Sequence, residues 1–244
     1  MIIDVGSISA TYSATVTYVL LFHRYEITMG FKNLWRSLRR RRTGEGELDE
    51  GEYTDVHARL MKNYPEVSEY WFLGVLLCAA ACGFACVTAY PTFTSAAVVP
   101  YGILLAIIFV VPLGIIGAVT GVGVTLNVLA EFIGGMISQG NALSLNLFKS
   151  FGYVTCAHAL SFTQDLKLAH YLKIPPRHTF AAQMVATLIS TFVSVAIMGI
   201  QFDFKDVCSP HAPMRFSCPG NNTFFTAAVL WGTIGPLKVF GAHV

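Results

Sequence analysis

Charge is what this 244-residue chain has least of. Asp, Glu, Lys and Arg together make up 12% of the residues, against about 25% in soluble domains, whereas hydrophobic residues make up 54%. The few charges gather in short stretches, and the long runs between them carry almost none. This scarcity excludes an ordinary soluble domain. It predicts an all-α integral membrane protein, a multi-span helical bundle.

The motifs of common enzyme classes are also missing. The chain contains no G-x-S-x-G, H-E-x-x-H, Walker A or C-x-x-C pattern. Its histidines show no metal-ligand spacing; among them are His158, His170, His178 and His211. We therefore expect a protein that is not an enzyme, with no metal site, no bound cofactor and no means of using ATP.

A basic leader is absent as well. The N-terminal residues MIIDVGSISATYSA are small and acidic, whereas a secretory signal peptide starts with basic residues. The chain begins inside or just before an apolar segment and ends at GPLKVFGAHV without a polar tail. We therefore expect a partial chain, cut from a longer membrane protein.

Several apolar segments are long enough to be membrane spans or parts of them. The predicted segments are 8–22, 71–89, 101–119, 124–137, 143–162, 179–200 and 224–240. Residues 124–137 are too few and too rich in glycine for an ordinary span, so we expect an interrupted or re-entrant helix there. Residues 23–70, basic and then acidic, are predicted to form a cytoplasmic loop.

The basic residues set the predicted orientation. Nine of the sixteen Lys and Arg residues lie between Arg24 and Lys62, including the run Arg39–Arg42. Next to membrane spans such a run indicates a cytoplasmic segment, so we expect no nucleic-acid partner. Residues 164–178 then lie inside and residues 201–223 outside. Segments 124–137 and 143–162 either cross and return or form a re-entrant hairpin from the inside.

The predicted outer loop carries two candidate modifications. Cys208 and Cys218 can form a disulfide because this face is oxidising, although two free thiols are the alternative. Asn221, in the sequon Asn221-Asn222-Thr223, is a weaker candidate for glycosylation because it lies close to the last predicted span.

Glu131 is the only acid inside the predicted spans, and Asn127 lies four residues earlier on the same helical face. A charge at the bilayer centre costs about 2.5–3.5 kcal/mol, so it normally faces a partner or a cavity. We therefore place Asn127 and Glu131 on a substrate or proton pathway, with Gly121 and Gly123 in the unwound part of a broken helix. Alternatively, Glu131 reaches interfacial water and the glycines only allow close packing.

A second charged stretch, QDLKLAHYLKIPPR, lies between apolar segments. Pro175 disfavours the α conformation at Ile174, so a helix is predicted to end near Lys173. From its charges and prolines alone, we interpret this stretch as an anchor where the chain leaves the membrane at the cytoplasmic face. Its candidate functional residues are Asp165, Lys167, His170, Lys173, Pro175, Pro176 and Arg177.

The order of these residues resembles a signature of the oligopeptide transporter (OPT) family. The similar stretches are NVLAEFIGGMISQGNALSLNLFKSFGYVTCAHALSFTQDLKLAHYLKIPPRHTFAAQ, DVHARLMKNYPEVSEYWFLGVLL upstream, and CPGNNTFFTAAVLWGTIGPLKVFG downstream. KIPPR is typical of the peptide-transporter clade. The resemblance covers about Ala14 to Gly241, and it implies that the chain is roughly a third of such a carrier, taken from its second half. In VTGVGVTLN and QGNALSLN this chain lacks residues that are common in the family.

The resemblance implies an all-helical carrier in the plasma membrane that imports small oligopeptides, such as tetrapeptides, pentapeptides or glutathione, by proton symport. Protons would be the coupling ion, the lipid bilayer and the peptide would be the partners, and the oligomeric state is open. The charged stretch would be a cytoplasmic gate or hinge in which Asp165 pairs with a base. The alternatives are a truncated, non-transporting membrane fragment, or a carrier of peptide–metal conjugates, which KIPPR opposes.

The predicted orientation gives a first test. A cysteine introduced near Ser209 in the full-length protein should react with a membrane-impermeant maleimide added to intact cells. Labelling that requires permeabilised cells would reverse the orientation.

Overall fold

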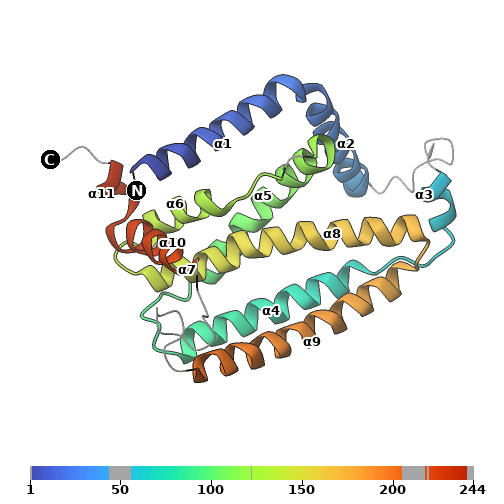
Figure 1. Cartoon of the computed structure of the whole chain (residues 1–244). Coiled ribbons are helices and arrows are strands. Elements are labelled where there is room, and N and C mark those ends of the chain that lie inside the picture. The colour runs from blue at the N-terminus through green and yellow to red at the C-terminus, as the bar shows by residue number, and fades with distance from the viewer. Residues whose placement is uncertain (1, 44–55, 122, 205–217, 219, 241–244) are drawn as a thin grey trace.

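The computed structural model describes residues 2–43, 56–121, 123–204, 218 and 220–240, which form helices and connections without a strand (Figure 1). Two elements, η1 and η3, are π-helical segments, in which the backbone bonds span one residue more than in an α-helix. In chain order the elements are α1 (Ile2–Phe22), α2 (Arg24–Thr43), α3 (Val56–Met61), α4 (Glu69–Ala89), α5 (Val98–Thr120), α6 (Asn127–Ile137), α7 (Ala142–Lys149), η1 (Ser150–Val154), α8 (Thr155–Leu172), α9 (Pro176–Asp203), α10 (Asn221–Ala227), η3 (Ala228–Ile234) and α11 (Pro236–Phe240).

Helices α4, α5 and α9 are long and apolar enough to cross a membrane. The segments predicted at 71–89, 101–119 and 179–200 lie within them. Helix α9 begins before its predicted segment, with Pro176 as its first residue. Proline is tolerated at this position because the N–H that it lacks would have no partner within the first turn of a helix. Most side chains of α4 and α9 stay exposed, as expected for helices that face lipid or other membrane-embedded protein.

The predicted cytoplasmic loop over 23–70 contains the helices α2 and α3. Arg, Lys, Leu and Met are strong helix formers, and no proline interrupts residues 24–43. Gly30 lets α2 approach α5, since an added Cβ there would lie 2.9 Å from Ile115 Cγ2.

The segment predicted at 143–162 is part of a longer helical path. Helix α7, the π-helical η1 and helix α8 follow one another without a break from Ala142 to Leu172. The charges after Phe162 do not end the helix because Asp165 and Lys167 are exposed. The path ends at Lys173, which has a left-handed φ of 62° just before Ile174-Pro175. This end agrees with the predicted proline stop.

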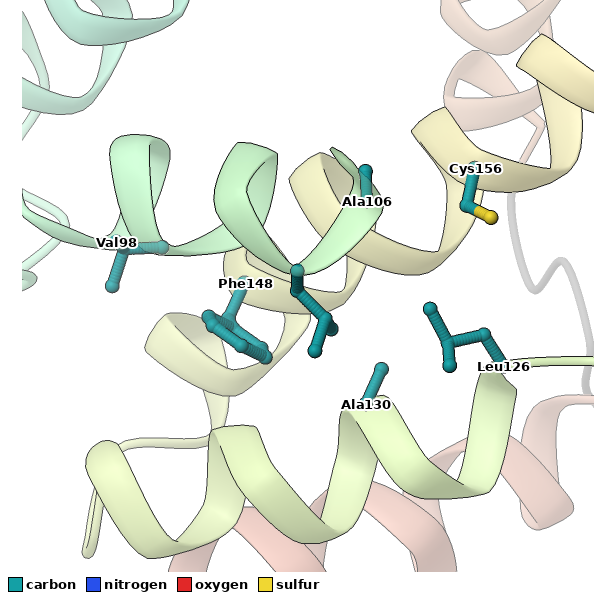
Figure 2. Close-up of a cluster of buried hydrophobic side chains, with 7 residues drawn as sticks. Val98, Ala106, Leu126, Ala130, Phe148 and Cys156 are labelled. Carbon is teal, nitrogen blue, oxygen red and sulfur yellow. The ribbon is translucent and has the colours of Figure 1, made fainter. Parts of the chain in front are cut away.

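One buried cluster joins α5 to the segments that follow it. Figure 2 shows side chains of α5 facing α6 and α7, with Phe148 beside Ala130 and Leu126 close to Cys156. The cluster consists of Val98, Leu105, Ala106, Leu126, Ala130, Phe148 and Cys156. Because these residues come from α5, α6, α7 and α8, the core of the described chain holds the interrupted helix in place.

Contacts at the two ends of the bundle decide between the two topologies left open by the sequence. At one end, Asn141 Nδ2 in the α6–α7 turn donates to Phe93 O in the α4–α5 connection at 3.0 Å. At the other end, Arg177 Nε donates to Glu66 O, just before α4, at 3.2 Å. The α6–α7 turn thus lies at the end where α4 finishes, so this part of the chain crosses and returns.

The lengths agree with a crossing. Helix α5 has 23 residues, or about 34 Å at 1.5 Å per residue. Helix α6 has 11 residues, or about 16 Å, and covers only half that distance. The described residues between the two helices, Gly121 and 123–126, are not helical, and they add to the length of this path. A short helix plus a non-helical connection therefore returns along the whole of α5, as Figure 1 shows.

The contact between α5 and η1 generates a stability prediction. A Cβ added at Gly102 would lie 2.6 Å from Phe151 Cβ, whereas a Cβ added at Gly117 in the same helix has nothing within 4 Å. We expect Gly102→Ala to destabilise the full-length protein by about 1–3 kcal/mol through overpacking. Gly117→Ala, the matched control, should be neutral or slightly stabilising. Size-exclusion chromatography of heated, detergent-solubilised protein measures both, and equal midpoints would contradict the packing described here.

Candidate functional site

The helix break predicted around Gly121 and Gly123 lies between α5 and α6. Gly121 ends α5 with a left-handed φ of 70°, and its N–H donates to Gly117 O at 3.0 Å. Glycine is the residue that adopts this conformation without strain. Both glycines are exposed, and neither has an atom within 4 Å of an added Cβ. They serve the backbone break, and their surroundings show no close packing.

Asn127 and Glu131 both lie on α6, directly after this break. Asn127 is the first residue of the helix and is half-buried. Glu131, one turn further, is only 6% exposed. The alternative in which Glu131 reaches interfacial water from a helix end therefore does not fit, because the residue packs inside the bundle.

Glu131 is held by Lys149, the last residue of α7. Lys149 Nζ donates to Glu131 Oε1 at 2.6 Å, with the Lys149 and Glu131 side chains 18% and 8% exposed. A charge-assisted bond of this kind is stronger than a neutral one. The pair joins the two helices of the α6–α7 hairpin at the point where the hairpin meets η1.

Sequence reasoning missed Lys149, although the signal was present. Between Trp71 and Phe162, Glu131 is the only Asp or Glu and Lys149 is the only Lys or Arg. Buried charges are normally paired, so two lone charges of opposite sign in one apolar region are expected to meet. The count of charges, rather than any motif, predicts the pair.

The segment α10–η3 packs beside the pair. Lys149 Nζ lies 5.8 Å from the ring centroid of Phe224 on α10, within the range of a cation–π contact. On η3, Trp231 packs edge-on against Phe132 of α6 at 6.2 Å between ring centroids. Gly135 permits this approach, because an added Cβ would lie 2.4 Å from Trp231 O. The α6–α7 hairpin and the segment α10–η3, which is distant in sequence, thus lie around one partly buried ammonium–carboxylate pair.

The second charged stretch lies elsewhere, because it starts in the C-terminal half of α8 and continues into the first residues of α9. Helix α8 has 18 residues and measures about 27 Å, so its C-terminal end lies far from Lys149, which is at the end of α7. Lys173 Nζ contacts His57 Nδ1 of α3 at 2.5 Å and His170 O at 3.4 Å. Together with the Arg177–Glu66 bond, these contacts tie the α8–α9 turn to the segment that precedes α4. We call this group, Lys173 and Arg177 with His57 and Glu66, the α8–α9 joint.

The remaining residues of that stretch contact neighbouring side chains or form the α8–α9 turn. Asp165 accepts a bond from Gln183 Nε2 on α9 at 3.0 Å, and its pairing with a base when the carrier closes stays a prediction. Lys167 Nζ lies 5.9 Å from the ring centroid of Tyr171. Pro175 caps α9, and Pro176 is its first residue. The two prolines thus start a helix directly after stopping another.

The predicted modifications are only partly within the described residues. Cys218 is disulfide-bonded, but its predicted partner Cys208 lies outside the described residues, so the pairing stays a prediction. His211 also lies outside them. Asn221 is exposed at the start of α10, and its glycosylation stays a prediction. Within the described part of the chain, the free cysteines are Cys78, Cys82, Cys86 and Cys156.

Comparisons with known proteins agree on one family. The model of the OPT oligopeptide transporter protein family matches residues 1–242. Oligopeptide transporter 7 of Arabidopsis thaliana is 38% identical over 239 residues, covering 95% of this chain and 29% of the relative. Oligopeptide transporter 2 of Saccharomyces cerevisiae is 32% identical, covering 98% and 28%. Sexual differentiation process protein isp4 of Schizosaccharomyces pombe is 33% identical, covering 95% and 27%.

The chain therefore spans less than a third of the length of these curated relatives. No solved structure shows a significant match to it.

The ion pair generates the next prediction. Lys149→Met leaves the Glu131 carboxylate buried without its partner and should destabilise the full-length protein by about 3–5 kcal/mol. The double variant Glu131→Gln/Lys149→Met removes both charges and should recover a large part of that loss. Thermal midpoints of the three proteins in detergent measure the effect. A double variant no more stable than the single one would show that the two charges do not depend on each other.

Proposed function

The chain belongs to the OPT oligopeptide transporter family, and from this premise we propose that it forms part of a carrier that imports small oligopeptides by proton symport. The peptides would be tetrapeptides, pentapeptides or glutathione, and the carrier would work in the plasma membrane. Protons are the coupling ion, and no bound cofactor takes part. Asn127 and Glu131 lie on the pathway, with Gly121 and Gly123 in the break beside them.

The buried ion pair between Glu131 and Lys149 is the observation that supports this proposal best. An acid deep in an apolar bundle costs free energy and is seldom kept without a role. Here it lies one turn after a helix break, where transporters commonly place their substrate and ion sites. A carboxylate can accept a proton, which makes Glu131 the residue to carry the coupling ion.

Protonation of Glu131 would change the site in a definite way. The neutral carboxyl no longer attracts the Lys149 ammonium as a charge, so the bond that joins α6 to α7 at 2.6 Å weakens. The α6–α7 hairpin can then move against α10–η3 at a lower cost. Proton binding is thus coupled to a change in packing around the break, as symport requires.

The α8–α9 joint suits a gate or hinge on the cytoplasmic side. Its contacts connect α3, the segment before α4, and the α8–α9 turn, which are far apart in sequence. The aromatic contact between Phe72 and Phe180, with ring centroids 4.9 Å apart, adds α4 to α9 next to it. Movement of α8 relative to α4 would have to break these contacts first.

Replacing the acid tests the proposal directly. In the full-length carrier, Glu131→Gln should abolish proton-driven uptake of labelled tetrapeptides and pentapeptides, because the amide cannot take up the proton. Uptake at about pH 5.5 and pH 7.5 measures the loss, and surface labelling confirms that the variant reaches the membrane.

Asp203→Asn is the matched control, since it also replaces an acid by its amide, at an exposed residue at the end of α9 that belongs to neither the ion pair nor the joint. It should retain uptake. Wild-type uptake and an unchanged pH dependence in Glu131→Gln would overturn the role of Glu131.

A further inference from the structure

We infer that Lys149 is the subsite for the C-terminal carboxylate of the transported peptide, and that Glu131 occupies this subsite while it is empty of substrate. The inference deepens the proposed function and rests on it. It assigns the base of the ion pair, which no motif singles out, to substrate recognition, and it leaves the acid as the proton acceptor.

The donor geometry of Lys149 is the first step. An ammonium has three N–H donors, and among the described residues Nζ donates to one acceptor, Glu131 Oε1 at 2.6 Å. The ring centroid of Phe224 lies 5.8 Å from Nζ, and the face of an aromatic ring is not a strong hydrogen-bond acceptor. Lys149 is therefore held by a single carboxylate, and a second carboxylate of the same chemistry can take that place.

The accessibility of the two side chains is the second step. Lys149 is 18% exposed and Glu131 is 8% exposed, so the ammonium is the more open member of the pair. The segment beside the ammonium presents Phe224, which is itself 54% exposed. The ammonium thus offers more surface to a ligand than the carboxylate does, and the ring of Phe224 lies near it.

Charge balance is the third step. Between Trp71 and Phe162, Glu131 is the only Asp or Glu and Lys149 the only Lys or Arg, and their opposite charges make the pair neutral as a unit. A proton on Glu131 leaves the Lys149 charge without compensation in an apolar bundle, which is unfavourable. A peptide carboxylate restores neutrality. The proton and the carboxylate are then bound together, since each is unfavourable without the other, and this links their transport.

The ligand class follows from this balance. A peptide α-carboxyl has a pKa of about 3.5, so it is ionised throughout the pH range in which such a carrier is assayed. An amidated C-terminus has the same shape without the charge and cannot replace Glu131. The subsite therefore distinguishes a free from an amidated peptide, and it is indifferent to the side chains along the peptide.

The experiment measures uptake of one tetrapeptide in free and C-amidated forms by the full-length carrier. The wild type should prefer the free form by about 30-fold or more in kcat/KM, the lower range for loss of one partner of a buried charge pair. Lys149→Gln should bring this ratio close to one, and Lys149→Arg should keep it. An N-acetylated tetrapeptide is the ligand control, and its discrimination should not change in Lys149→Gln.

A purely structural pair would behave differently. The swap Glu131→Lys/Lys149→Glu keeps one acid and one base at the same two positions, so a structural pair would retain the preference for free peptide, whereas a carboxylate subsite at position 149 would lose it. If Lys149→Gln does not transport, binding of the two peptides to the purified variant by thermal shift gives the same ratio.

The outcomes separate the two proposals. No peptide uptake by the wild-type full-length carrier would remove the proposed function and this inference with it. Proton-coupled uptake with equal use of free and amidated peptide, or the same preference in wild type and Lys149→Gln, would overturn the Lys149 subsite alone.

Discussion

The pairing of Glu131 with Lys149 is the constraint on which the described structure depends. An apolar region that carries one acid and one base has to bring them together, because either charge alone is costly away from water. Since Glu131 is on α6 and Lys149 ends α7, the pair requires these helices to lie side by side. The break at Gly121 ends α5 and lets the chain turn into α6.

Close packing of small residues supplies the rest of the framework. Gly134 lies against Phe148, Gly135 against the backbone of Trp231, and Gly232 against Ala142, each too close for an added Cβ to fit without movement. In a bilayer the hydrophobic effect does not press helices together, so van der Waals contact at small residues takes over that role. The same residues that bring α7 and η3 against α6 thus surround the ion pair.

The described structure contains two groups of polar contacts, the ion pair and the α8–α9 joint, and α8 connects them. The ion pair lies at the α6–α7 hairpin, and the α8–α9 joint lies at the far end of α8. A continuous helix transmits displacement along its axis, and the π-helical η1 lies at the end of α8 next to Lys149. π-helical turns are frequent at functional sites. A change at the pair can therefore reach the joint through one rigid element.

Much of this protein could be read from local patterns. Uncharged runs predicted the segments that lie in α4, α5 and α9, the glycines at 121 and 123 predicted the break, and Ile174-Pro175 predicted the end of α8. These features depend on neighbours in the chain. Four features were not predicted from the sequence. They are the helix α2, the length of the helical path from Ala142 to Leu172, the bond from Gln183 to Asp165, and the pairing of Lys149 with Glu131. Charge alone does not stop a helix, and partners 18 residues apart in sequence are chosen by how helices pack.

The sequence by itself thus determined which residues are apolar, where the backbone must turn and that one acid lies among them. Only the tertiary structure decided that the chain crosses at α6 and returns through α7 and α8, and that the acid meets Lys149. The reason is that contacts between distant segments follow from the packing of the whole bundle.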